Sequence, residues 1–108
     1  MTYGEINDML NSFGLPVAYY EFKEDTDREP PFIVFFYAYD DLHADNINYG
    51  HKVQLNIELY TDIKDIDQET ELEQRLTELG FSYGKESQFI ESERMWQTLY
   101  YMEVFING

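Results

Sequence analysis

Cysteine is absent from this chain of 108 residues, and its absence excludes several kinds of chemistry together. Disulfide scaffolds, cysteine-ligated zinc or iron–sulfur sites and thiol nucleophiles all need the missing side chain. Long apolar runs are absent as well, since no stretch of about 18 apolar residues occurs. The first ten residues, MTYGEINDML, have neither the basic segment nor the apolar run of a signal peptide. We therefore expect a soluble protein with no membrane partner.

Basic residues are scarce. Seven Lys and Arg stand against 22 Asp and Glu, which gives a formal net charge of −15 at pH 7. Affinity for phosphate backbones and anionic membranes comes mainly from Lys and Arg, so nucleic-acid binding is disfavoured. The chain is nevertheless 44% hydrophobic and 18% aromatic, more than disordered chains contain. It should fold, and its ten Tyr and eight Phe favour half-buried rings on sheet faces or at interfaces.

Motifs of catalysis and cofactor binding are also missing. The six glycines are scattered singly, so neither a P-loop nor a dinucleotide fingerprint is formed. No serine stands in a G-x-S-x-G context. These absences predict a protein that is not an enzyme, holds no cofactor and works through contacts with other proteins.

Two helices are predicted from caps and apolar spacing. Thr2 and Glu5 have the spacing of a capping box, and one helical stripe of apolar residues follows: Ile6, Met9, Leu10 and Phe13. Asp65 or Asp67 can cap a second helix, which ends near Gly80 and carries a stripe of leucines: Leu72, Leu76 and Leu79. Between and after the helices the pattern changes to that of strands.

Five runs are predicted as strands: Val17–Phe22, Phe32–Tyr39, His51–Tyr60, Phe81–Glu91 and Arg94–Ile106. The second run is apolar or aromatic throughout, which predicts cover on both of its faces. The third alternates apolar and polar residues, and the last two indicate a hairpin. With no linker or repeat in the chain, we expect a single α+β domain over 1–108. Its mainly antiparallel sheet would have four to five strands, with two helices packed on one face.

Carboxylates and histidines are the residues of this chain that could form a metal or acid–base site. His43 and His51 with Asp45 could form a metal or acid–base site. However, Asp-rich loops are usually turns, and the segment 40–48 lacks the spacing of a calcium loop. The pairs Glu69/Glu73 and Glu71/Glu73 lie on the second helix, where a row of glutamates is more often a solvated face. No metal or catalytic residue is therefore assigned.

Several short strings in order resemble the tail-terminator, or tail-completion, proteins of long-tailed bacteriophages and prophages of Gram-positive bacteria. The strings span nearly the whole chain: Leu15-Pro16-Val17-Ala18-Tyr19, Pro30-Pro31-Phe32-Ile33-Val34, Ala44-Asp45-Asn46 before a strand ending Glu58-Leu59-Tyr60-Thr61, and Ile90-Glu91-Ser92-Glu93 before a Tyr-rich last strand. The short N-terminal helix and the Glu-rich second helix occupy corresponding places. None of the strings is a catalytic signature.

The resemblance implies a ring, of six subunits, that ends the tail tube and presents the head–tail joining surface. Its partners would be further copies of itself, the tail-tube protein and neck or head-completion proteins. It would reside in the host bacterial cytoplasm during assembly and then in the virion tail or neck. The loops Lys23–Pro31 and Asp40–Gly50 are the candidate contact segments, and the candidate contact residues within them are Asp25, Asp27, Arg28, Asp40, Asp41, His43, Asp45, Asn46 and Tyr49.

The acidity fits such a ring in two ways. Carboxylates that line a channel repel the phosphate backbone, so DNA passes without specific binding. Like charges also slow the encounter of subunits until a template supplies compensating contacts. Two alternatives remain open at this point: an acidic inhibitor or immunity protein that mimics the charge of nucleic acid, and a small hydrolase or metal enzyme centred on His43, His51 and Asp45.

Overall fold

The first helix forms where its capping box stands. A computed structural model of the chain describes residues 1–21, 29–38 and 50–107, and in it α1 spans Tyr3–Asn11. The Glu5 backbone N–H donates to Thr2 Oγ1 at 3.1 Å, and the Thr2 N–H donates to Glu5 Oε1 at 2.9 Å. Two otherwise unpaired donors of the first turn are thereby satisfied. Ile6, Met9 and Leu10 of the predicted stripe are buried, whereas Phe13 lies beyond the end of the helix and is partly buried against the core.

The second helix, α2 (Ile66–Glu78), begins at Asp65. The Asp65 carboxylate accepts a hydrogen bond from the Gln68 N–H at 3.0 Å, so Asp65 rather than Asp67 is the cap. Leu72 and Leu76 are buried. The helix ends before Gly80, whose φ of +81° is the left-handed conformation that glycine adopts without steric cost. Neither helix in the described part of the chain is long and apolar enough to cross a membrane.

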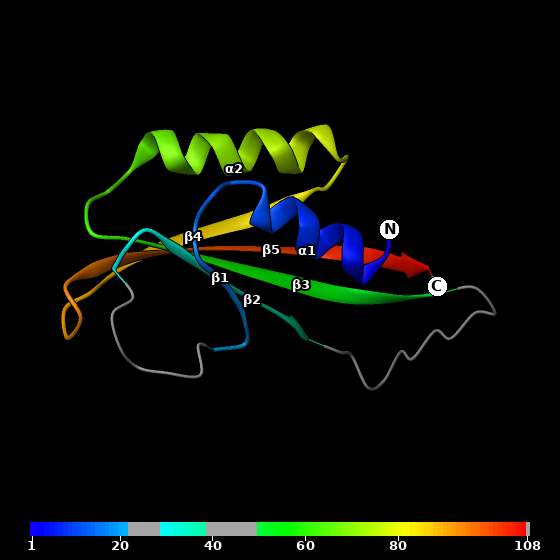
Figure 1. The fold of residues 1–108 in the computed structure, drawn as a ribbon, viewed down its shortest axis with the longest axis horizontal. Helices are drawn as coiled ribbons and strands as arrows, with labels where there is room; N and C mark the ends of the chain where they lie inside the picture. Colours follow the sequence, from blue (N-terminus) through cyan, green and yellow to red (C-terminus); the bar gives the residue numbers. More distant parts are fainter. Residues whose placement is uncertain (22–28, 39–49, 108) are drawn as a thin grey trace.

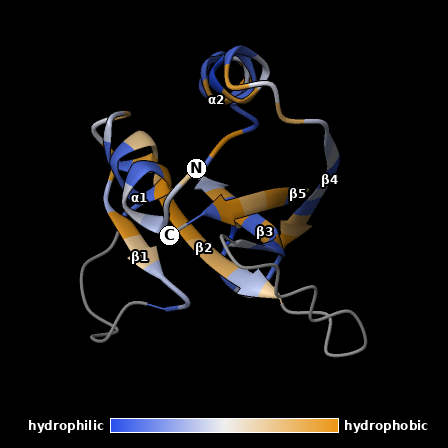
Figure 2. Cartoon of the chain, turned by 90° about the vertical axis from the view of Figure 1, so that its right-hand side faces the viewer, coloured by the Kyte–Doolittle hydropathy of each residue, from blue (hydrophilic) through white to orange (hydrophobic). Residues whose placement is uncertain are grey.

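Five strands form one sheet in the order β1-β2-β3-β5-β4. Their bounds are Val17–Tyr19 for β1, Phe32–Ala38 for β2, Gly50–Thr61 for β3, Tyr83–Ile90 for β4 and Met95–Asn107 for β5. The strand β1 is parallel to β2, and every other neighbouring pair is antiparallel. Both helices lie on the same face of the sheet (Figures 1 and 2). The predicted α+β fold is confirmed, and its sheet is mixed because of β1.

The core lies between the helices and the sheet. Apolar residues of α1, α2 and the inward-facing positions of β2, β3 and β5 form one buried cluster. Along β5 the alternation is regular, with Tyr100, Met102, Val104 and Ile106 all buried and the intervening residues facing the other side. Among the described residues, both helices lie on one face of the sheet, and neither covers the outer face (Figure 2).

One strand ends earlier than the sequence predicts. The run Val17–Phe22 was expected to be extended, whereas β1 ends at Tyr19. The Tyr20 N–H still donates to the Phe35 carbonyl at 2.7 Å, but Tyr20 has φ = 72°, which ends the extended conformation of the strand. Phe22 lies outside the described residues.

The expected cover on both faces of β2 is confirmed, because five of its seven residues are buried. On the outer face, the Tyr60 ring stacks on Phe32 with centroids 4.8 Å apart, and the Tyr20 ring lies 5.5 Å from that of Phe36. Aromatic residues of the chain itself thus contribute to the second cover.

Candidate functional site

The nine candidate contact residues of the sequence analysis all lie in the segments 22–28 and 39–49, outside the residues that the structure describes. They are Asp25, Asp27, Arg28, Asp40, Asp41, His43, Asp45, Asn46 and Tyr49, and each stays a prediction. Among the features of the described residues are two pockets with aromatic walls, two exposed apolar patches and one buried charge network.

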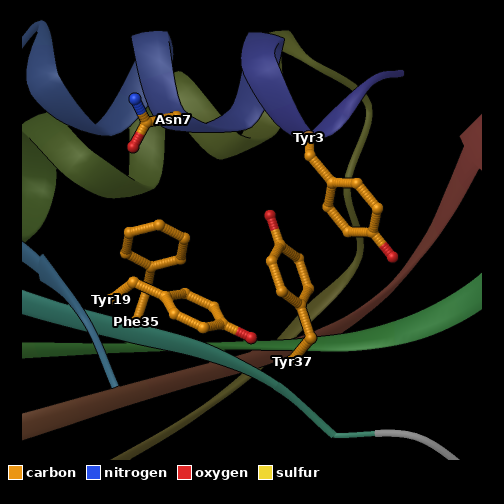
Figure 3. A pocket seen from close by; sticks show the side chains of 5 residues that line it. All are labelled: Tyr3, Asn7, Tyr19, Phe35 and Tyr37. Carbon is orange, nitrogen blue, oxygen red and sulfur yellow. The ribbon is translucent and has the colours of Figure 1, made fainter. Parts of the chain in front are cut away.

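The first pocket lies between α1 and the β1–β2 edge of the sheet. It has a volume of about 380 Å³ and is lined by Tyr3, Asn7, Tyr19, Phe35 and Tyr37. Figure 3 shows Tyr3 and Asn7 reaching down from the helix toward the rings of the strands. The ring centroids of Tyr3 and Tyr37 are 4.9 Å apart, and those of Tyr19 and Phe35 are 5.2 Å apart, both in edge-to-face contact. Such walls suit apolar or aromatic side chains.

His51 joins this aromatic region rather than a cluster of acids. The Tyr3 hydroxyl lies 3.0 Å from His51 Nε2. Of the other members of the metal site that the sequence could have formed, His43 and Asp45 lie outside the described residues. Within the described ranges no group of three or more His, Cys, Asp and Glu side chains could hold a metal ion.

Two exposed apolar patches lie at opposite edges of the sheet. The β1 patch consists of Tyr19 and Tyr20, whose residues are 49% and 63% exposed. The β4 patch consists of Phe89, which is 45% exposed, with Ile63 and Ile66, which are 65% and 59% exposed. The strands β1 and β4 are the two edge strands, and the two patches differ in composition.

The β4 patch is anchored by the single tryptophan of the chain. The Phe89 and Trp96 rings pack edge to face with centroids 5.5 Å apart. Lys64 Nζ lies 5.6 Å from the centre of the Trp96 ring, which is within cation–π range. Lys64 directly follows Ile63, so the segment before α2 is tied to Trp96, the ring that also contacts Phe89. The three apolar residues of the patch are largely exposed.

A buried charge network ties α2 to the β4–β5 hairpin. Glu69 is only 2% exposed, and its two oxygens lie 2.7 Å from Lys64 Nζ and 2.9 Å from Lys85 Nζ. Glu73 Oε2 lies 2.6 Å from Lys85 Nζ and accepts the hydroxyl of buried Tyr100 at 2.7 Å. The network thus joins two carboxylates of one helix to side chains of three other segments.

The ionisation of this network follows from its geometry. Burial opposes ionisation of Glu69, but hydrogen bonds and charge from Lys64 and Lys85 outweigh burial and hold the pKa of this carboxyl below its usual value. Burial, together with the bond to Glu73, raises the pKa of Tyr100 far above its usual value. Burial would lower the pKa of Lys85, yet Glu73 and Glu69 raise it. Glu69 and Lys85 are therefore charged at neutral pH, and Tyr100 keeps its proton.

The interpretation of α2 as carrying only a solvated row of glutamates is wrong for Glu69. Helical spacing places Glu69 three residues before Leu72 and seven before Leu76, on the buried stripe. That spacing is visible in the sequence. Its meaning was missed because a buried carboxylate requires partners, and Lys64 and Lys85 come from outside the helix.

The second pocket lies on the outer face of the sheet and combines aromatic rings with carboxylates. It has a volume of about 190 Å³ and is lined by Tyr20, Glu21, Phe32, Val34, Glu58, Tyr60 and Glu93. The Tyr60 hydroxyl donates to Glu58 Oε1 at 3.0 Å and accepts from Gln97 Nε2 at 2.7 Å. Burial and the nearby charge of Glu58 raise the pKa of Tyr60 to about 12. We name it the acidic aromatic pocket.

Comparisons of the chain with models of protein families, with curated proteins and with solved structures found no match.

Proposed function

We propose that the chain is a subunit of a ring that ends the tail tube of a long-tailed phage or prophage and provides the surface for head–tail joining. The observation that carries this proposal is the pair of unlike apolar patches at the two edges of one sheet. Contact between two different patches is heterologous, and repeated heterologous contacts close into a ring when the rotation per subunit allows it. A single self-complementary patch would instead favour a two-fold dimer.

The position of the carboxylates supports the ring over a charge mimic. A mimic of nucleic acid needs carboxylates across one continuous surface, whereas a ring needs apolar contacts on its flanks and acidity toward its channel. In the described residues, Asp67, Glu71 and Glu78 are exposed on α2, while Tyr20 and Phe89 are exposed at the sheet edges. Exposed carboxylates of α2 suit a channel wall, since they repel passing DNA.

The formal charge of −15 also accounts for ordered assembly. Like-charged subunits meet slowly at low ionic strength, because repulsion acts over roughly 10 Å in about 0.1 M salt. Contacts with the end of a tail tube would compensate for that repulsion. We therefore propose that the ring of six forms on its template, with the tail-tube protein on one side and neck proteins on the other.

The test uses two variants that each block one patch. Tyr20→Glu removes the β1 patch, and Phe89→Glu removes the β4 patch. Gln74→Glu is the matched control, because it adds the same carboxylate at an exposed position of α2. The wild type and the control should cap purified tail tubes and narrow their length distribution in electron micrographs, whereas neither blocked variant should do so.

Mixing the two blocked variants distinguishes a heterologous contact from a self-complementary one. Each blocked variant retains one intact patch, so the mixture can form a dimer through the two intact patches but cannot extend to a ring. Native mass spectrometry should therefore detect mixed dimers and no hexamers. Wild-type protein that remains a monomer with tail tubes and leaves their lengths unchanged would refute the proposal, and inhibition of a nuclease by that monomer would establish the charge mimic.

A further inference from the structure

The acidic aromatic pocket is open on the side of the sheet that carries no helix. Its walls come from the end of β1, from β2 and β3, and from the β4–β5 turn, and they meet around Tyr60. The outer-face register places Phe32 opposite Tyr60 and Val34 opposite Glu58. The same register places Tyr60 opposite Gln97. Because the pocket is built mainly on paired strands, its shape is fixed by the sheet.

The size of the pocket limits what it can hold. Its volume of about 190 Å³ is below the roughly 300–1,000 Å³ that is typical of small-molecule and cofactor sites. The stacked rings of Phe32 and Tyr60 are nearly parallel, with 17° between their planes, and Val34 is 7% exposed. A pocket with these walls accommodates one long side chain rather than a cofactor.

The charge of the pocket determines which kind of side chain it can bind. Three carboxylates line it, those of Glu21, Glu58 and Glu93. The ion pairs among the described residues use other carboxylates, those of Glu69, Glu73 and Glu78. The hydroxyl of Tyr60 occupies only one oxygen of Glu58. The other oxygen of that carboxylate is therefore able to accept a bond from an incoming donor.

We propose that the acidic aromatic pocket binds the guanidinium of an arginine that a different protein presents. A guanidinium is planar, stacks on aromatic faces and donates to carboxylates in a fixed fork, whereas an ammonium does none of these equally well. The pocket supplies both aromatic rings and carboxylates at one place. Tyr20 belongs both to the pocket and to the β1 patch. The inference therefore rests on the proposed function, in which this edge of the sheet contacts other proteins, and it adds which side chain of a partner would bind there.

A different protein fits this role better than a second copy. The chain has seven Lys and Arg against 22 acids. Three of the five basic residues in the described ranges, Lys64, Arg75 and Lys85, are already paired with glutamates. The charge of −15 is instead complementary to a basic segment on a partner, for which electrostatic attraction would speed association.

The experiment titrates the isotopically labelled full chain with N-acetyl-arginine amide and follows the signals of the Val34 methyls and the Tyr60 ring by NMR. The matched probe is N-acetyl-citrulline amide, which has nearly the same shape without the charge, and N-acetyl-lysine amide tests the preference for a planar cation. We expect saturable shifts with arginine, weaker affinity with lysine and no shift with citrulline.

Two variants test the carboxylates, and one is a control. Glu58→Gln and Glu93→Gln should each weaken arginine binding by roughly three- to fivefold, as expected for a partly exposed charge pair. Glu103→Gln changes an exposed carboxylate on the same outer face, two rows away, and should leave the affinity unchanged. Equal shifts with citrulline, shifts that do not saturate, or equal weakening by Glu103→Gln would overturn the inference.

The outcomes for the pocket and for the ring are separable. The titration measures binding to the subunit itself and needs neither a ring nor a tail tube. A negative titration with normal capping of tubes would refute the pocket and leave the ring standing. Saturable arginine binding by a chain that never caps tubes would refute the ring and leave the pocket standing.

Discussion

Glu69 offers the sharpest test of how the fold is held together. The change Glu69→Gln keeps the size of the side chain but removes its charge, so its amide can accept a bond from one lysine while its NH₂ group faces the other. Lys64 and Lys85 are each about one-third exposed, with side-chain exposures of 35% and 37%, and water can partly replace the lost carboxylate. We therefore expect a loss of about 2 kcal/mol, within the range for hydrogen bonds to charged groups, rather than the larger cost of a fully buried pair.

The fluorescence of Trp96 reports this loss directly. Trp96 is the only tryptophan and lies beside Lys64, so urea unfolding can be followed without an added label. A loss of about 2 kcal/mol with a slope of about 1.5 kcal/mol per molar urea lowers the midpoint by about 1.3 M. Glu71→Gln is the control, because Glu71 is exposed on the same helix and should change stability by less than about 0.5 kcal/mol.

The effect of Glu69→Gln on stability should depend on pH, and this dependence tests whether Glu69 is ionised in the folded protein. Since the pKa of Glu69 is lowered by folding, its contribution is fully present above the unfolded value, near 4.5, and is lost as the pH falls through the folded value. The difference in unfolding free energy between wild type and Glu69→Gln should thus be constant from pH 7 to about pH 5 and shrink below pH 4.5. A difference that grows as the pH falls would mean that folding raises the pKa of this carboxyl instead of lowering it, and would refute the reasoning.

Four further predictions address other parts of the protein. Tyr100→Phe removes the hydroxyl that Glu73 accepts at 2.7 Å and should cost about 1–2 kcal/mol in urea unfolding, with no such cost for Tyr101→Phe on the outer face. A Cβ at Gly84 would overlap the ring of Tyr101; Gly84→Ala should therefore destabilise the protein by about 1–2 kcal/mol, and adding Tyr101→Ala should remove the clash part of that cost. A Cβ at Gly50 would overlap the backbone carbonyl of Ile106, so truncating a side chain should not rescue Gly50→Ala in the same assay. Raising the salt concentration from about 0.05 to 0.5 M screens interactions between exposed charges. Self-association in sedimentation should increase because the repulsion between acidic subunits is weaker, whereas arginine binding should weaken because its attraction to the carboxylates is screened. If self-association and arginine binding both rose or both fell, the two surfaces would not act through these different forces.

The sequence predicts the helices well because their determinants are local. Thr2 and Glu5 satisfy each other within one turn, and Asp65 caps α2 through a residue three positions away. The strand faces follow equally directly from alternation, because the period of two places successive side chains on opposite faces. These features need no knowledge of distant partners.

The features that the sequence does not predict depend on contacts between distant segments. The strand β1 ends at Tyr20, where φ turns positive, although the Tyr20 N–H still binds the carbonyl of Phe35, fifteen residues later, and no local pattern indicates this combination. Glu69 is buried because Lys64 and Lys85 converge on it from two other segments. The acidic aromatic pocket likewise arises from register, since pairing of β2 with β3 is what brings Phe32 beside Tyr60.

The carboxylates of the described residues serve at least three different purposes, so net charge alone does not discriminate between a ring and a charge mimic. Glu69 is buried inside the fold, where its ion pairs link α2 to the hairpin. A charge mimic could not present this carboxylate to a partner. Glu58 is tied to Tyr60 at the wall of a pocket. Only carboxylates such as Glu71 and Glu78 face solvent from α2. The placement of apolar side chains on both edges of the sheet supports the proposed ring, because contact with a neighbouring subunit would remove their apolar area from water.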